Sequence, residues 1–181
     1  MSWSADRKRL EQDLLCEKLR GRVQYFFTHY HAAPDQYGRF AVRVDGQEVL
    51  RANPYQEVYY SLSADQIKEA ASIPAREWTK RGYLHEEENQ AAEEAGRNAA
   101  LQAGHIDSYD MPHAIHTYLN QPVEQSLWSA DPLVRLFAVL DRRVGRRTLQ
   151  KVRDAYPDQP EWLRRFYRLR LDAEGIALPL E

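Results

Sequence analysis

The most strongly patterned stretch of this sequence runs from residue 131 to residue 176, and it predicts helices that must be buried. Asp131-Pro132 is typical of a helix start, because a side-chain acceptor at the N-cap precedes a proline at the first helical position. Apolar residues then recur at helical spacing, at Leu133, Leu136, Phe137, Leu140 and Val144. One continuous apolar stripe of this kind has to pack against other elements. Gly145 can end the helix in a left-handed conformation.

A second helix is expected to begin near Pro160 and to end at Gly175. It places Trp162, Phe166 and Leu169 on one line, with Leu163 and Tyr167 beside them. Together with the first third of the chain, these helices predict the composition of the core. The expected core residues are Phe27, Val42, Leu136, Phe137, Leu140, Trp162 and Phe166.

Two runs in this region resemble the C-terminal signature of a family of small bacterial proteins of unknown function. They are RLFAVLDRRVGRRTLQKV at 135–152 and WLRRFYRLRLDAEGI at 162–176, with LDRRVGRR and FYRLRLDAEGI as their motifs. GRVQYFFTHY and GRFAVRVDGQEVL, nearer the start, resemble that family's N-terminal half, and the match is weaker between residues 54 and 102. The resemblance implies a small, soluble bacterial domain. It brings no activity and no site residues with it.

Period-two patterning is confined to the first third of the chain and predicts an antiparallel meander. A helix over 4–19 is followed by three candidate strands at 22–31, 39–44 and 47–52. Asp45-Gly46 between the last two is a strong hairpin signal. The third strand turns either Val49 or, if its register slips, Leu50 toward the core.

After residue 53 the patterning is helical. Helices are expected from Asn53-Pro54, over 85–103, from Asp107 or Ser108, and over 123–128, before the stretch described first. Strands that precede helices instead of alternating with them predict an α+β fold. We expect an N-terminal helix, a three-stranded antiparallel β-meander and an all-helical C-terminal two-thirds. The whole chain, 1–181, is expected to be one domain, with helix plus meander in 1–53 and the helical part in 54–181.

Charge limits the classes of partner. The formal net charge of -2 argues against general affinity for nucleic acid. The distribution is uneven, because 54–130 holds 12 acidic and 5 basic residues, whereas 131–181 holds 8 acidic and 11 basic ones. Either the oppositely charged parts face each other or the solvent, or the basic part is a local face for an acidic partner.

The single cysteine and the absence of long apolar runs indicate the cellular compartment in which the protein is expected. Cys16 alone excludes an internal disulfide. The opening MSWSADRKRL lacks the apolar segment of a signal peptide, and no apolar run approaches the length of a membrane span. We therefore expect a cytoplasmic protein with no membrane partner.

Arginines near the C-terminus are the candidate binding residues. Leu140 and Val144 are expected to point inward, and each residue turns a helix by about 100°, so their polar neighbours should face solvent. The candidate basic face is Arg142, Arg143, Arg164 and Arg165. Guanidinium groups there could hold a phosphate or a partner's carboxylate bidentately. In the other interpretation the arginines form internal ion pairs, and we expect one between Asp141 and one of Arg146, Arg147 and Arg168.

Two histidine pairs are the weaker candidates for chemistry. His29 and His31 share a face if they lie on a strand, and His113 and His116 are neighbours on a helix. Four imidazoles could meet at a zinc or nickel ion, although neither an HExxH motif nor a cysteine pair supports such a site.

No catalytic motif and no phosphate-binding glycine loop is present in the sequence, so we expect no cofactor. The leading hypothesis is a non-enzymatic protein-binding module, such as an adaptor, a regulator or an immunity-type protein, whose partner has an acidic surface. The alternative is a small metal-dependent hydrolase built on the four histidines.

Overall fold

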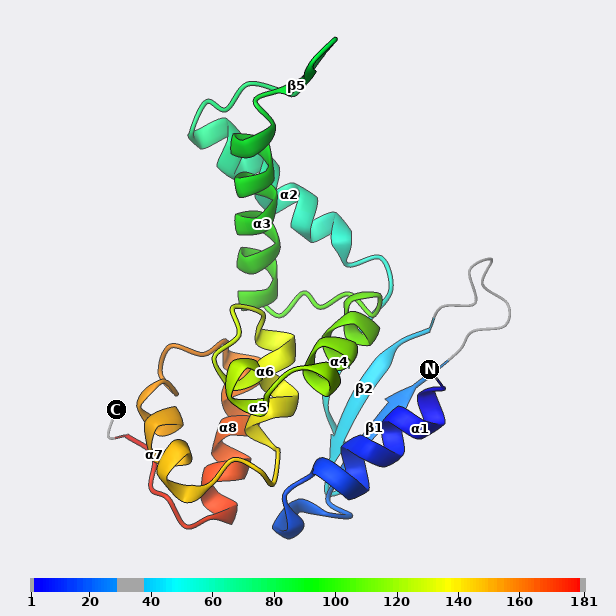
Figure 1. Cartoon of the computed structure of the whole chain (residues 1–181), viewed down its shortest axis with the longest axis vertical. Helices are drawn as coiled ribbons and strands as arrows, with labels where there is room; N and C mark the ends of the chain where they lie inside the picture. The colour runs from blue at the N-terminus through cyan, green and yellow to red at the C-terminus, as the bar shows by residue number, and fades with distance from the viewer. Residues whose placement is uncertain (1, 29–37, 180–181) are drawn as a thin grey trace.

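The structure is a computed structural model that describes residues 2–28 and 38–179. Figure 1 shows a sheet and an N-terminal helix on one side, a group of helices beside them, and a long helical hairpin that projects away from both. The predicted α+β class and the order of its parts are confirmed. In the described ranges, none of the helices is both long enough and apolar enough to cross a membrane.

The helices and strands of the described residues have the following bounds. The helices are α1 (Trp3–Lys8), the π-helix η1 (Arg9–Leu14), the 3-10 turn η2 (Glu17–Leu19), α2 (Glu57–Ala70), α3 (Glu86–Gln102), α4 (Asp110–Asn120), α5 (Val123–Leu127), α6 (Pro132–Val139), α7 (Arg146–Asp154) and α8 (Glu161–Ala173). The strands are β1 (Val23–Phe27), β2 (Phe40–Val44), β3 (Gln47–Ala52), β4 (Glu77–Thr79) and β5 (Gly82–Leu84).

The N-terminal helix is shorter than the expected 4–19, because the backbone after Leu14 pairs with a distant loop. Leu15 and Asp141 form an isolated antiparallel bridge. In it the Cys16 amide donates to the Leu140 carbonyl at 2.9 Å, and the Arg142 amide donates to the Leu14 carbonyl at 2.7 Å. The exchange of helical for tertiary hydrogen bonds ends the helix at this point.

The three-stranded meander forms as predicted, in the order β1-β2-β3. Asp45 and Gly46 both have positive φ, 51° and 80°, as a two-residue hairpin of this kind requires. An irregularity between Val42 and Arg43 shifts the pairing with β3. Of the two alternatives for β3, Leu50 is the buried one, at 5% exposed, and Val49 is only partly buried.

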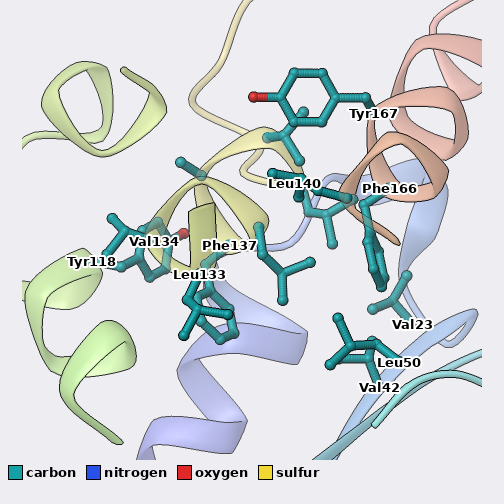
Figure 2. Packing of buried hydrophobic residues seen from close by; sticks show 14 of the residues in the cluster. Val23, Val42, Leu50, Tyr118, Leu133, Val134, Phe137, Leu140, Phe166 and Tyr167 are labelled. Carbon is teal, nitrogen blue, oxygen red and sulfur yellow. The ribbon is translucent and has the colours of Figure 1, made fainter. Parts of the chain in front are cut away.

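The core lies where α6 packs against α4, α5 and α8, next to the sheet (Figure 2). Five of the seven expected core residues are buried, namely Val42, Leu136, Phe137, Leu140 and Phe166. Phe27 and Trp162 are partly buried and pack against this core. The Asp131 cap is confirmed, since its carboxylate accepts from the Leu133 amide at 2.8 Å. Between the two expected C-terminal helices lies a further one, α7, which buries Leu149 and Val152.

Residues 57–102 form the projecting hairpin, which we call the arm (Figure 1). It consists of α2 and α3 packed side by side, with the β4–β5 hairpin between them. Gly96 explains how the two helices approach so closely, because a Cβ at this position would lie 2.4 Å from the Ala64 nitrogen. The β4–β5 pair is an addition to the expected all-helical remainder, and it pairs with itself and not with the central sheet.

The arm begins and ends at one point on the rest of the described chain, which we call the body. Asn53 and Asp107 form a parallel bridge there, with the Asn53 amide donating to Ile106 and the Ser108 amide donating to Asn53. Asn53-Pro54 does not cap α2 as expected. The cap is the buried Asp107 carboxylate, which accepts from the Gln56 amide at 2.5 Å and the Glu57 amide at 3.1 Å.

Candidate functional site

The four arginines of the predicted basic face do not line one depression. Arg142 and Arg143 follow α6 and line what we call the basic hollow, together with Cys16, Glu17, Lys18, Arg170 and Glu174. Arg165 lines a second depression, the sheet–helix groove, formed by Val44, Val49, Arg168, Leu169 and Asp172 among others. Arg164 is partly buried on α8, and its Nε has no hydrogen-bond partner among the described residues.

Asp141 organises one wall of the basic hollow. Its side chain is fully buried and accepts a hydrogen bond from the Tyr118 hydroxyl at 2.5 Å. Arg143 donates to the same carboxylate from its backbone amide at 2.7 Å and from Nη2 at 2.6 Å. Burial, and after it the neighbouring Asp141 charge, raises the pKa of Tyr118, so this hydroxyl stays protonated and donates.

The predicted partner of Asp141 is therefore wrong: the ion pair is with Arg143, not with Arg146, Arg147 or Arg168. The reason is local. The helix ends at Val139, and the following turn folds Arg143 back over the carboxylate two residues earlier. Arg146 donates to the carbonyls of Glu174 and Gly175 instead, and Arg168 donates to the Tyr156 hydroxyl at 2.8 Å. Arg147 is exposed, without an ion pair in the described part of the chain.

Glu174 organises the opposite wall. It accepts hydrogen bonds from the buried Arg170, from Lys18 Nζ at 3.0 Å and from the Cys16 thiol at 3.4 Å. Burial acts to raise the pKa of Glu174, but the hydrogen bonds from Arg170 and Lys18 outweigh it and lower the pKa to about 2. Burial raises the pKa of the Cys16 thiol, so Cys16 is protonated at neutral pH and is not an activated nucleophile.

These pairings leave Arg142 as the exposed cation of the hollow whose side chain makes no hydrogen bond or ion pair within the described ranges. Lys18 is exposed too, but it is shared with Glu174. The arrangement can hold a carboxylate or phosphate by charge.

Only two of the four histidines of the predicted metal site lie in the described residues. His113 and His116 are exposed on α4, and His116 contacts the Asn120 amide at 3.2 Å. His29 and His31 lie outside the described residues. Across 2–28 and 38–179, no group of three or more His, Cys, Asp or Glu side chains is arranged to hold a metal ion.

The sequence did not indicate that the arm exposes large apolar side chains. Of the nine large apolar side chains exposed in the described residues, six lie on it: Val58, Tyr59, Leu62, Trp78, Tyr83 and Leu84. Tyr59 stacks on His105 with ring centroids 3.8 Å apart, so one of its faces is covered. Trp78 is 70% exposed and, with Tyr83 and Leu84, forms what we call the tip. The Trp78 and Tyr83 rings contact each other edge to face at 4.9 Å.

The outer side of α2 carries a second exposed feature, which we call the outer stripe: Val58, Leu62, Asp65 and Glu69. Spacings of four, three and four residues place these side chains on one line along the helix. Ala64, on the other side of α2, is buried against Gly96 of α3. Helical spacing in this region was visible in the sequence, but which side of the helix faces solvent was not.

Ion pairs join the elements of the arm and involve most of its basic residues. Arg76 donates to Glu86 and, bidentately, to Glu93, which also accepts from Lys68. At the base of the arm, Arg97 bridges Asp110 at 3.3 Å and Asp131 at 3.1 Å. The carboxylates that remain give the arm an acidic surface.

Comparison with known proteins identifies the family from nearly the whole chain. The SF0329 protein family matches residues 2–171, which include the body, the arm and most of α8. This chain belongs to the SF0329 protein family. The family is uncharacterised, so membership supplies no activity. No curated protein and no solved structure matches the SF0329 chain.

Proposed function

We propose that this SF0329 family protein is a non-enzymatic protein-binding module and that the arm is its binding surface. The observation that carries the proposal is the gathering of exposed large apolar side chains on one projecting element, away from the core. An apolar patch on the surface, rimmed by charge, is typical of a site that another macromolecule covers.

The tip has the properties of an anchor for a partner. Tryptophan and tyrosine are the residue types that most often dominate binding energies. Trp78 and Tyr83 come from paired strands and support each other through their ring contact. Little side-chain freedom is then lost on binding, which favours affinity.

The test is capture of partners by Trp78→Ala. Tagged protein is used to retrieve binding proteins from the cells that produce it, and the amounts retrieved are compared with wild type. Loss of an aromatic anchor is expected to weaken binding by about 2 kcal/mol, roughly 30-fold. The melting temperature should not change, because the side chain is 70% exposed.

Trp128→Ala is the matched control, since Trp128 is 51% exposed and lies off the arm, just after α5. It should retain capture. Equal capture by wild type, Trp78→Ala and Trp128→Ala would contradict a role for the tip.

The basic hollow is proposed as a separate contact for an acidic group, with Arg142 as its free cation. Arg143 is a poor probe because it holds Asp141. Arg142→Glu is therefore the informative change: it should leave stability within about 0.5 kcal/mol of wild type, as expected of an exposed residue. Capture that is both weakened and less sensitive to salt would support the contact, and capture equal to wild type at every salt concentration would refute it.

A further inference from the structure

We propose that the partner of the arm is a second copy of this chain, with the outer stripe of each α2 seated in the sheet–helix groove of the other copy. The inference rests on the proposed function, because it uses the arm as the binding surface, and it adds the identity of the partner. The stripe and the groove match each other in chemistry.

The outer stripe is divided along its length. Val58 and Leu62, both about half exposed, form its apolar half near the base of the arm. Asp65 and Glu69 form its acidic half, further along α2. Neither carboxylate has an ion-pair partner in the described part of the chain. A surface that is complementary to this stripe must therefore be apolar at one end and basic at the other.

The sheet–helix groove has both parts. Val44 and Val49 from the sheet and Leu169 from α8 are partly buried hydrophobic residues and supply the apolar part. Arg165 and Arg168 supply the basic part. Arg165 has no carboxylate partner among the described residues, and Arg168 donates to a neutral hydroxyl, that of Tyr156.

One carboxylate, Asp172, also lines the groove. Two guanidinium groups against one carboxylate leave the groove positive. The two carboxylates of the stripe would meet an excess of positive charge, which favours docking. A stripe docked end to end the other way would place its carboxylates on the apolar part of the groove, which is unfavourable.

The same complementarity extends beyond the contact itself. Several arm carboxylates have no ion-pair partner in the described ranges: Asp65, Glu69, Glu77, Glu87, Glu88 and Glu94. In the described C-terminal helices and loops, unpaired cations outnumber unpaired acids. The cations without a carboxylate partner in the described ranges are Arg142, Arg146, Arg147, Lys151, Arg164, Arg165 and Arg168. The acidic arm of one copy is therefore attracted to the basic C-terminal part of another copy.

A two-fold arrangement makes this contact twice. In an isologous dimer, the stripe of the first copy meets the groove of the second and the reverse also holds. A specific dimer buries about 1,200–2,000 Å² in total, and two equivalent contacts supply twice the area of one. Projecting arms therefore favour a reciprocal pair over a single arm contact.

The experiment is a charge exchange monitored by sedimentation velocity over a range of protein concentrations. One variant carries Asp65→Arg with Glu69→Arg, and the other carries Arg165→Glu with Arg168→Glu. Each alone would place like charges together at both contacts, so its dimer dissociation constant should rise on the order of 100-fold. In a one-to-one mixture every contact again joins opposite charges, so a heterodimer of near wild-type affinity is expected.

Asp13→Arg with Glu124→Arg is the matched control, because it makes the same change in net charge as Asp65→Arg with Glu69→Arg at exposed positions outside the arm and the groove. It should still dimerise, and circular dichroism should show all variants folded. A wild-type chain that stays monomeric at millimolar concentration, or a mixture of the two variants that fails to associate, would overturn the inference. The proposed function would survive either result if Trp78→Ala still lost capture of a different protein.

Discussion

The carboxylate of Asp141 joins segments that lie far apart in the sequence. It binds the Tyr118 hydroxyl and Arg143, while its backbone pairs with Leu15. Asp141→Asn keeps the shape of the side chain but removes the negative charge to which Tyr118 and Arg143 donate. Hydrogen bonds to charged groups contribute about 1.5–3 kcal/mol each, so we expect a loss of about 2–3 kcal/mol in the free energy of unfolding.

Urea denaturation followed by circular dichroism measures this loss. Asp154→Asn is the control, because Asp154 pairs with Arg153 at 2.8 Å on an exposed surface. Exposed pairs contribute at most about 1 kcal/mol, so the control should be close to wild type. Equal losses for the two variants would mean that Asp141 is no more important than a surface residue.

Glu174 predicts how stability depends on pH. Its pKa is about 2 in the folded protein against 4.5 as the ordinary value. A carboxylate with a lowered folded pKa stabilises the protein above its unfolded pKa, and this contribution is lost as pH falls from about 4.5 to about 2. Glu174→Gln should therefore lower stability at neutral pH and flatten the decline in acid, as read from urea midpoints at several pH values.

Glu93 shares this behaviour, since hydrogen bonds from Arg76 and Lys68 lower its pKa to about 2. Some acid sensitivity should thus persist in Glu174→Gln and decrease further in the double variant with Glu93→Gln. Glu87→Gln removes an exposed carboxylate and is the control. A pH profile of Glu174→Gln identical to that of wild type would be evidence against the Arg170–Glu174 contact.

At the scale of elements, the arm depends on the absence of a side chain at Gly96. A Cβ there would lie 2.4 Å from backbone of α2, which cannot yield as a flexible side chain would. Gly96→Leu should separate α2 from α3 and expose the arm to proteolysis, whereas the body remains folded. Ala95→Leu is the matched control, because Ala95 is exposed on the same helix and can accept the larger side chain.

Limited proteolysis with mass spectrometry measures the outcome. Cleavage of Gly96→Leu is expected within residues 57–102, at least tenfold faster than in Ala95→Leu, since rapid cleavage reports local opening. Resistance equal to that of the control would show that the two helices can part slightly without losing their packing.

At the scale of the whole molecule, the body should fold without most of the arm. Ala64 and Gly96 are in contact, so a short Gly-Ser linker can replace residues 65–95 without moving either end. Most of the core cluster lies outside this segment. Such a variant should unfold cooperatively in urea, because its hydrophobic core is retained. An unfolded product would contradict this expectation and would mean that the arm is needed for the fold. That outcome would favour the single domain predicted from the sequence, which stays a prediction.

Local patterns were enough to predict much of the fold. Alternation of apolar residues located β1, β2 and β3, and Asp45-Gly46 located their hairpin, because these features depend on neighbours in the sequence. Asp131 capped α6 for the same reason. The apolar stripe around Phe137 correctly predicted the centre of the core.

Contacts between distant segments decided the rest. The cap of α2 comes from Asp107, 50 residues away, and the end of the N-terminal helix comes from the bridge between Leu15 and Asp141. Arg143 replaced the expected partners of Asp141 because α6 ended earlier than its stripe predicted. Leu62 has helical spacing like a core residue, yet it is exposed, since none of the described elements packs on the outer side of α2. Spacing determines which residues share a face, and only the tertiary arrangement determines what covers that face.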